Sequence, residues 1–412
     1  MSHSRAARVV ASALIVAALG ASRAAGAQQG ADSCNGAPSE PVAFIDVPGN
    51  PFQALPSADG CWIFVSMPGG AGRGSSKIGV LRRARGKLSL ERVMPIDGNA
   101  TGMVLTHDGR TLIVADGPRI AFIDAEKLVK TRRDAVLGYL DEPGRLGRIY
   151  ANVTSDDRTL FVADENAKTI TVIDLPKIRA SQFRASSIIG KIPTGAAPIA
   201  LTFSADEKLL YTTSQRPPTG LSWPIECKRE GGAAADTMPV NPQGAVLVVD
   251  VERARTDPAH SVIASAPAGC SPVRLVLSPS GDRAYVTARN NNALLVFDAA
   301  KLRTDPAHAR IGSVAVGTAP VGIAVIDSGR KIVVTNSNRF ARSSDDRQTL
   351  TVVDAAMIGS GNGAILGSIP AGAFPREMRV TPDGTTLIVT NFASSSIETI
   401  DLTRLPIAPA KP

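Results

Sequence analysis

The sequence predicts an all-β protein, a seven-bladed β-propeller built from four-stranded antiparallel blades. One motif, a turn of small residues followed by an apolar run and a second apolar run ending in Asp, occurs seven times along the 412 residues. The equivalent turn positions are spaced by 49, 48, 50, 74, 48 and 55 residues, and they are Asp59, Asp108, Asp156, Asp206, Ser280, Ser328 and Asp383. A four-stranded sheet repeated at nearly this period is typical of a propeller blade.

The fifth copy shows the four strands of one blade. Its strand-sized segments are "PVRLVLS" (272–278), "RAYVTA" (283–288), "ALLVFD" (293–298) and "RIGSVAVG" (310–317). Alternating apolar and polar residues, frequent β-branched residues, and Gly, Asp or Asn at the breaks favour strands over helices. A β-solenoid is the rival architecture, but its repeats are shorter and lack two tight hairpins per unit.

The two ends of the repeat region are expected to complete one blade together. The last copy has three strands and then ends at "TRLPIAPAKP", whereas "PVAFIDVPG" (41–49) has the fourth-strand pattern and precedes the first full copy. We therefore expect residues 41–49 to close the ring as the fourth strand of the seventh blade, which leaves no long open edge. The propeller then spans residues 41–405, with a lead-in at 28–40 and a tail at 406–412.

The repeats resemble the YVTN β-propeller repeat family. The resemblance rests on "AYVTA", "IVVTN" and "LIVTN", each followed by a strand ending in Asp and a turn of the "VGTAP" type, and it covers residues 41–402. Copies one and four depart from this pattern, with "FVSM" and "YTTS". The resemblance implies an extracytoplasmic protein, and similar propellers include lactonase-like enzymes and electron-transfer dehydrogenase subunits. Its motifs are structural, so they specify the blade and leave the activity open.

Residues 1–27 have the features of a secretory signal peptide. Arg5 and Arg8 precede "VVASALIVAALGA", and small residues lead to Ala27, where cleavage is expected. A membrane anchor is the alternative, but this run is too short to cross a bilayer, and no other segment approaches about 20 continuous apolar residues. We therefore expect a periplasmic or secreted protein without a membrane span.

The charge of the chain argues against a nucleic-acid partner. Without residues 1–27 the chain has 42 basic and 37 acidic residues, a net charge of +5 rather than +8. This small excess is spread along the chain, whereas nucleic-acid binding requires basic residues clustered on one face.

The four cysteines are expected to form two disulfides. In a secreted chain an even number of cysteines favours disulfides, although four allow three pairings. Propeller topology places Cys34 near Cys61 on the bottom face and Cys227 near Cys270 on the top face, so these are the expected pairs. A metal site is the alternative, but the sequence has no CxxC, and the only histidines after residue 27 are His107, His260 and His308. The absence of CxxCH also excludes covalently attached haem.

The Asp that ends the third strand of most copies is expected to be structural. A catalytic role would require seven equivalent active-site carboxylates, which is not expected of an enzyme. Asp side chains in turns commonly accept hydrogen bonds from nearby backbone N–H groups. His260 and His308 lie in the twice-repeated "RTDPAH", and a repeated loop of this kind is also interpreted as structural.

Candidate binding residues line the expected central channel. Alternate residues of each first strand face the channel and form two rings. The upper ring consists of Gln53, Gly102, Tyr150, Ala200, Arg274, Gly322 and Glu377. The lower ring consists of Leu55, Val104, Asn152, Thr202, Val276, Ala324 and Arg379. Arg274 and Arg379 would hold a carboxylate or phosphate, and Glu377 would act as a base. Tyr150 and Asn152 are further binding candidates. The alternative is a solvated ion-pair cluster that lines a water-filled pore.

The loops of the top face provide a second candidate site. The largest insertion, residues 215–243, joins the second and third strands of the fourth blade, and shorter insertions occur at the same place in the first and sixth blades. Arg216 and Trp223 in the large insertion offer a cationic and aromatic patch to a large partner.

Two classes of function follow. The first, which the sequence favours, is a monomeric, non-enzymatic propeller whose top-face loops bind a protein, a glycan or a small anionic ligand. The second is a lactonase-like hydrolase that uses Arg274, Glu377 and Arg379. The sequence contains no GxSxG, HExxH, GxxxxGK or EF-hand pattern, so no metal or cofactor is expected.

Overall fold

The computed structural model describes residues 34–70, 75–131, 134–221, 223–229, 238–339 and 348–409. The expected signal peptide (1–27) and the first part of the lead-in lie outside the described residues. Parts of the three top-face insertions also lie outside them.

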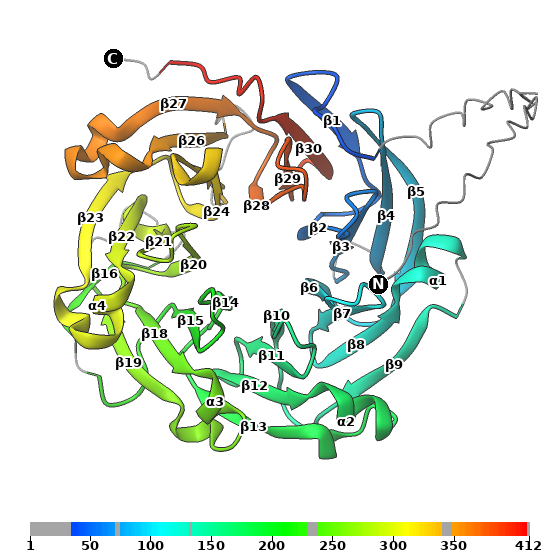
Figure 1. Cartoon of the computed structure of the whole chain (residues 1–412). Coiled ribbons are helices and arrows are strands. Elements are labelled where there is room, and N and C mark those ends of the chain that lie inside the picture. Colours follow the sequence, from blue (N-terminus) through cyan, green and yellow to red (C-terminus); the bar gives the residue numbers. More distant parts are fainter. Residues whose placement is uncertain are drawn as a thin grey trace, which may run out of the picture.

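The protein is a seven-bladed β-propeller, as predicted: seven four-stranded antiparallel sheets stand in a ring (Figure 1). Blade 1 consists of β2 (Gln53–Pro56), β3 (Trp62–Met67), β4 (Ser76–Ala84) and β5 (Lys87–Ile96). Blade 2 consists of β6 (Ala100–Leu105), β7 (Thr111–Asp116), β8 (Arg119–Asp124) and β9 (Val136–Asp141). Blade 3 consists of β10 (Arg148–Val153), β11 (Thr159–Asp164), β12 (Thr169–Asp174) and β13 (Ile188–Pro193).

The remaining blades follow the same order. Blade 4 consists of β14 (Thr202–Phe203), β15 (Leu209–Ser214), β18 (Ala245–Asp250) and β19 (Val262–Pro267). Blade 5 consists of β20 (Pro272–Leu277), β21 (Arg283–Ala288), β22 (Ala293–Asp298) and β23 (Arg310–Ala315). Blade 6 consists of β24 (Pro320–Ile326), β25 (Lys331–Asn336), β26 (Thr349–Asp354) and β27 (Ile365–Pro370), and blade 7 begins with β28 (Pro375–Val380), β29 (Thr386–Asn391) and β30 (Ser396–Asp401).

The fourth strand of blade 7 comes from the other end of the chain, which confirms the predicted closure. β1 (Val42–Asp46) pairs antiparallel with β30, with Val42 opposite Ile400 and Asp46 opposite Ser396. At the C-terminal side, Ala408 and Ser368 of β27 exchange two backbone hydrogen bonds of 2.9 Å. The hydrogen bonding of the ring therefore extends beyond residue 405, and the tail adds to the edge of blade 6.

The blades hold together through apolar side chains on both faces of their sheets. One buried cluster joins Val246 and Val248 of blade 4 to Leu275 and Val286 of blade 5. Strands buried on both sides require compact β-branched and aliphatic residues, which the repeats supply.

The hairpin between the first and second strands of each blade has a residue with positive φ. Glycine occupies this position in several blades, as at Gly60 (φ 71°) and Gly109 (φ 70°). Where an acid replaces glycine, its side chain binds the preceding blade: Asp157 accepts hydrogen bonds from the backbone N–H groups of His107 and Asp108, at 2.9 and 3.0 Å. Glu207 accepts from Ser155 N at 3.0 Å in the same way. These contacts offset the cost of the left-handed conformation.

The recurring Asp caps a short helical turn after the third strand, as expected of a structural residue. The α-helices are α1 (Ala125–Lys130), α2 (Leu175–Ala180), α3 (Val251–Ala254) and α4 (Ala299–Thr304). Each begins after an Asp that accepts a hydrogen bond of 2.9 Å from a backbone N–H in the first turn, and these residues are Asp124, Asp174, Asp250 and Asp298. None of the helices in the described part of the chain has the length and apolar character needed to cross a bilayer.

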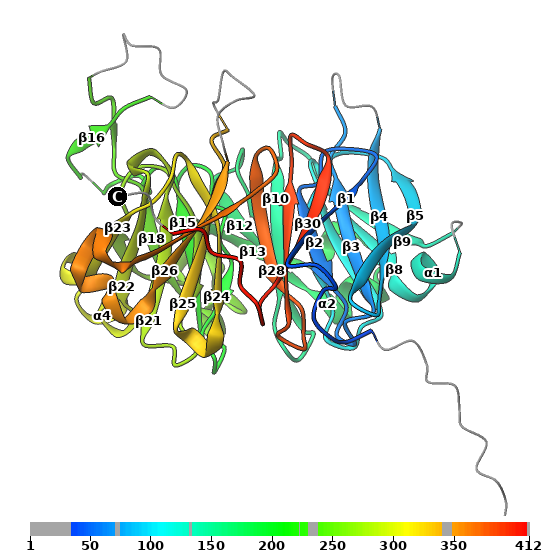
Figure 2. The same cartoon turned by 90° about the horizontal axis from the view of Figure 1, so that it is seen from above.

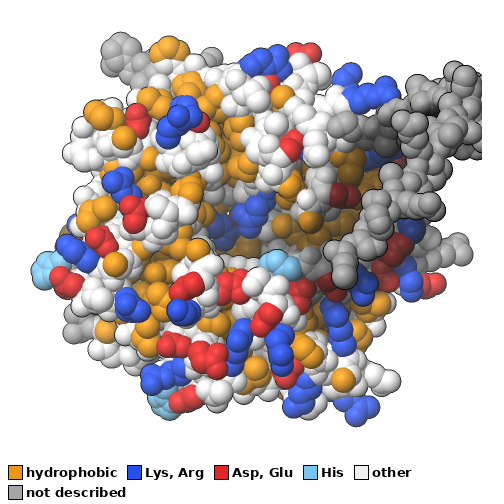
Figure 3. Space-filling view, in the orientation of Figure 1, with side chains coloured by type: hydrophobic (Ala, Val, Ile, Leu, Met, Phe, Trp, Pro, Cys, Tyr) orange, Lys and Arg blue, Asp and Glu red, His pale blue; other side chains and the backbone are white. Residues whose placement is uncertain are grey.

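The two faces of the ring differ. The loops from second to third strands in blades 1, 4 and 6 project from one face, the top face of Figure 2, as the topology predicted. Figure 3 shows the opposite, bottom face, which lacks these projections and has Lys and Arg side chains near its centre.

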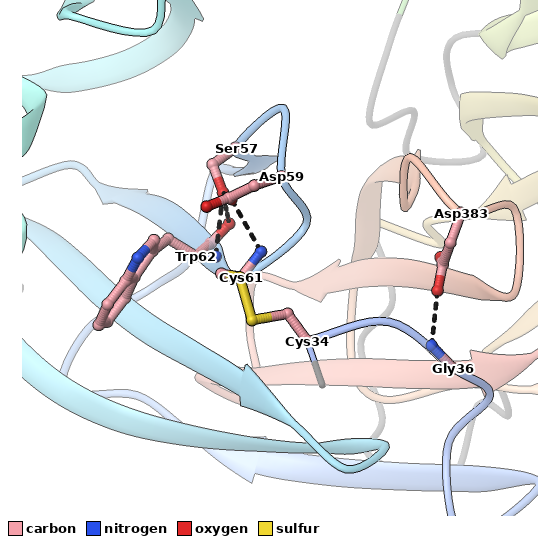
Figure 4. Close-up of a disulfide and its surroundings, with 7 residues drawn as sticks. All are labelled: Cys34, Gly36, Ser57, Asp59, Cys61, Trp62 and Asp383. Carbon is pink, nitrogen blue, oxygen red and sulfur yellow. Dashed lines mark hydrogen bonds between the residues drawn. A yellow bond between two sulfur atoms is a disulfide. The ribbon is translucent and has the colours of Figure 1, made fainter. Parts of the chain in front are cut away.

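At the bottom of the seam between blades 1 and 7, the lead-in is fixed by a disulfide (Figure 4) and by a buried arginine. Cys34 and Cys61 form the first predicted disulfide, and Gly36 N donates to Asp383 Oδ2 at 2.7 Å. Arg83 of β4, with only 2% of its side chain exposed, donates to Gly36 O at 2.5 Å and to Asp383 Oδ2 at 2.9 Å. One guanidinium group therefore connects blade 1, the lead-in and blade 7.

We predict that Arg83→Met destabilises the ring by about 3 kcal/mol at neutral pH, because it leaves a partly buried carboxylate without its charge partner. Burial acts to raise the pKa of Asp383, but hydrogen bonds from Arg83, Gly36 and nearby threonines outweigh it and hold this pKa below its usual range. The stabilisation is thus present above about pH 3.8 and is lost as pH falls further. Thermal melts at pH 7 and pH 3 test this, with exposed Lys87→Ala as control. An equal loss of stability by Arg83→Met at both pH values would contradict the assignment.

Candidate functional site

The upper ring of predicted channel residues consists of alternating large and small side chains, which close the central channel. The blades with odd numbers supply Gln53, Tyr150, Arg274 and Glu377, which are 1%, 6%, 7% and 2% exposed. The blades with even numbers supply Gly102, Ala200 and Gly322. Because the large side chains are almost fully buried, they form a plug rather than the lining of an open pore.

The glycines in this ring make space for the plug. A Cβ atom on Gly102 would lie 2.5 Å from Cδ1 of Tyr150, and one on Gly322 would lie 2.8 Å from the carbonyl oxygen of Arg376. Both distances are shorter than van der Waals contact. Any larger residue at these positions would therefore displace the Tyr150 side chain or the backbone of the neighbouring first strand.

Arg274, Glu377 and Arg379 meet, as the sequence suggested, in an ion-pair cluster. Arg274 Nε donates to Glu377 Oε2 at 2.8 Å, and Arg379 Nη1 donates to Glu377 Oε1 at 2.8 Å. Burial acts to raise the pKa of Glu377, but the Arg274 and Arg379 charges outweigh it and hold this pKa below its ordinary value. The carboxylate is therefore charged, and both of its oxygen atoms are already engaged by arginines.

The other two channel candidates also have partners within the fold. The Tyr150 ring stacks against Arg274, whose Cζ lies 3.7 Å from the ring centroid. Asn152 Nδ2 donates to the carbonyl oxygen of Leu201 at 2.9 Å, which links blade 3 to blade 4. Within the cluster, Arg274 and Glu377 are buried, whereas the side chain of Arg379 is 40% exposed. The role of the cluster in ligand binding stays a prediction.

Above this plug lies a set of residues that the sequence analysis did not identify. The Arg376 guanidinium lies 3.7 Å from the Phe52 ring centroid and 5.7 and 5.8 Å from the centroids of Phe374 and Phe392. Nearby, burial raises the pKa of Glu165, against the opposing charges of Arg376, Arg289 and Arg339. In the sequence, the run "FPRE" (374–377) indicates part of this cluster. Which phenylalanines surround Arg376 depends on closure of the ring.

Two buried carboxylates have strongly raised pKa values. Burial raises the pKa of Asp116 to about 7 although Arg119 opposes the shift, and burial raises that of Glu398 to about 7 although Asn391 donates to it. Glu398 is fully buried, and among the described residues its Oε1 atom has no hydrogen-bond partner. It lies on the face of β30 that also carries Ile400, which packs in the cluster between blades 6 and 7.

The large insertion of blade 4 stands above the top face (Figure 2). It contains β16 (Ile225–Cys227), which pairs with β17 (Asn241–Pro242), and the second predicted disulfide, Cys227–Cys270, attaches this hairpin to the turn before blade 5. Arg216 is exposed and Trp223 is half-buried.

Apolar side chains of the same insertion lie in solvent. Ile225 is 62% exposed, Met238 72% and Val240 44%. Met238 and Val240 precede β17, so these side chains surround one short hairpin. The sequence pattern did not single them out, because scattered aliphatic residues in a loop resemble those of any surface loop, whereas Arg216 and Trp223 are typical of binding surfaces.

The histidines of the bottom face each contact a neighbouring carboxylate. His260 Nδ1 lies 2.9 Å from Asp257, His308 Nδ1 lies 2.9 Å from Asp305, and His107 Nδ1 lies 3.1 Å from Asp157. No group of three His, Cys, Asp or Glu residues within the described ranges is arranged to hold a metal ion.

Comparison with family models and with curated proteins gave no match. Among solved structures, hydrazine synthase of Kuenenia stuttgartiensis is similar with a TM-score of 0.62 and 16% identity, over 87% of this chain and 96% of that chain. A chain of the mitotic checkpoint complex is similar with a TM-score of 0.63 and 13% identity, over 96% and 99% of the two chains. The β-propeller domain of Cps50 (Swd1) of Myceliophteria thermophila gives 0.56 and 12%, over 87% and 97%. At these identities the likeness shows the propeller fold alone.

We predict that Arg274→Met destabilises the protein by about 3 to 5 kcal/mol, because Glu377 then stays buried and lacks one of its charge partners. The double variant Arg274→Met with Glu377→Leu should recover most of this loss, since apolar groups replace both charges. Denaturant unfolding of the two single variants and the double variant measures the coupling. Near-neutral single variants would contradict a structural role and favour a ligand site in the channel.

We predict that Glu398→Gln stabilises the protein above pH 7 and has little effect below pH 4.5. Because the folded-state pKa is raised to about 7, the wild type loses stability as pH rises from about 4.5 to 7, by up to about 3 kcal/mol. The neutral amide removes this penalty. Melting curves of both proteins across this range test it, with the exposed Glu40→Gln as control. A difference in stability that does not change with pH would contradict the assignment.

Proposed function

We propose that this protein is a periplasmic or secreted binding module that holds a protein partner through the blade 4 insertion on its top face. One observation carries the proposal: a disulfide-attached hairpin that presents Ile225, Met238 and Val240 to solvent. The two disulfides favour an oxidising compartment. The YVTN-like repeats and the signal-peptide pattern of residues 1–27 support the same location.

The hairpin has the properties of an interface centre. Apolar side chains that lose water on association supply most of the favourable free energy, and interfaces concentrate this energy in a few central residues. The Cys227–Cys270 disulfide restricts the hairpin before binding, so less conformational entropy is lost when a partner binds. Neighbouring Arg216 and Trp223 provide residue types that are common at such centres.

The hydrolase alternative has less support in the geometry. A general base must reach the proton that it abstracts, whereas Glu377 is 2% exposed and both of its oxygen atoms accept from arginines. A glycan or a small anion remains an alternative ligand for the top face. Among the similar folds, the mitotic checkpoint complex is by its name an assembly, which illustrates protein binding by a propeller and is an analogy of fold only.

We predict that the double variant Ile225→Ser with Met238→Ser reduces partner capture at least tenfold, since each buried aliphatic side chain contributes about 1.5 to 3 kcal/mol. The matched control is Leu137→Ser with Ile189→Ser, which removes two exposed apolar side chains from outer strands of blades 2 and 3. Capture from an extracytoplasmic extract is quantified for both variants and the wild type, with melting curves as a folding check. Equal capture by all three proteins would contradict the proposal.

A further inference from the structure

A pocket of about 530 Å³ lies at the base of the blade 4 hairpin. Among the described residues that line it, Arg216, Lys228 and Arg229 are basic and none is acidic. All three basic residues are exposed. Arg216 lies at the start of the insertion, whereas Lys228 and Arg229 directly follow β16 near its middle, so the folded hairpin is what brings them around one cavity.

These three cations differ from most of the arginines inside the ring. Arg83 and Arg274 each form an ion pair with a carboxylate. By contrast, the described residues place no Asp or Glu within salt-bridge distance of Arg216, Lys228 or Arg229. Like charges around one cavity repel each other, and a bound anion relieves that repulsion.

The wall of the pocket is fixed before any ligand arrives. Cys227, in the wall, is bonded to Cys270, and the backbone N–H of Val240 donates to the carbonyl oxygen of Cys227 at 2.8 Å. On the blade 5 side, Cys270 N donates to Asn291 Oδ1 at 2.6 Å. Gln215 N donates to the carbonyl oxygen of Ala196 at 2.9 Å. A preorganised wall means that binding loses little conformational entropy.

One side of the pocket, which we call its apolar rim, consists of Val240 and Pro242, and Ile225 pairs with Pro242 in the hairpin. This rim distinguishes between possible anions. An inorganic phosphate would use the cations and leave this apolar surface exposed to water. A polypeptide with carboxylates next to aliphatic side chains would use both.

We infer that this pocket binds an acidic peptide segment of the protein partner, one in which Asp or Glu residues stand next to aliphatic residues. The inference rests on the proposed function and names the chemistry that the partner must present. The three cations contact the carboxylates, and the apolar rim covers the neighbouring aliphatic groups. Because the contacts are partly exposed, the interaction weakens as salt concentration rises.

Fluorescence anisotropy with two labelled peptides tests the inference on the full chain with its disulfides intact. One peptide repeats Glu-Glu-Leu and the other repeats Gln-Gln-Leu. The first should bind at least about tenfold more tightly, since only it offers charge-assisted contacts. The triple variant Arg216→Gln, Lys228→Gln, Arg229→Gln should lose this preference.

The matched control is the triple variant Arg158→Gln, Lys301→Gln, Arg310→Gln, which removes the same charge from exposed positions on other blades. It should bind the Glu-Glu-Leu peptide as the wild type does. Equal loss in both triple variants would show a general effect of net charge and would overturn the site. Inorganic phosphate that binds as tightly as the peptide would overturn the peptide assignment.

The same variants separate this inference from the proposed function. If Ile225→Ser with Met238→Ser reduces partner capture while the pocket triple variant changes neither capture nor peptide binding, the acidic-segment inference is wrong and the binding role of the hairpin stands. If neither variant affects capture, both are wrong. Loss of capture in both, with loss of the Glu peptide preference in the triple variant, supports both.

Discussion

The pairing of β1 with β30 is the contact on which the rest of the structure depends. Every other blade takes its four strands from one continuous stretch of chain, whereas blade 7 takes its outer strand from the region before blade 1. Without that strand, β30 has an unpaired outer edge and blade 7 has only three strands. The lead-in reinforces the same seam, because Arg83, Asp383 and the Cys34–Cys61 disulfide connect segments from the two ends of the chain.

A closed ring also decides what the centre of the molecule can do. Seven first strands converge on one axis, so their inward side chains compete for a narrow space. The chain accommodates them by alternating large residues with Gly102, Ala200 and Gly322, and the result is a plug with a compensated charge cluster. The predicted binding residues of the channel thus also link blades that are not neighbours, as Arg274 of blade 5 does with Glu377 of blade 7.

With the centre filled, surface chemistry concentrates on the insertions of the top face. The described part of the blade 4 insertion contributes no strand to any blade, and it is attached to the ring by Cys227–Cys270. Stability and recognition are thereby separated. The ring depends on buried strands and the seam, whereas the hairpin carries exposed apolar groups and cations that form no ion pair with any described residue. Substitutions in such a loop change what is bound at little cost to the fold.

The sequence by itself determined the number of blades, the strand that closes the ring, the capping Asp residues and both disulfide pairs. Each of these follows from local periodicity, turn chemistry or the order of segments, which are properties of short stretches of chain. Tertiary structure alone decided the filled channel, the position of Arg376 against phenylalanines of blades 1 and 7, the burial of Glu398, and the pocket that unites Arg216 with Lys228 and Arg229. These features depend on distances between residues far apart in the chain and on the loss of solvent around them. The repeat pattern of the sequence contains no information about these distances or about this loss of solvent.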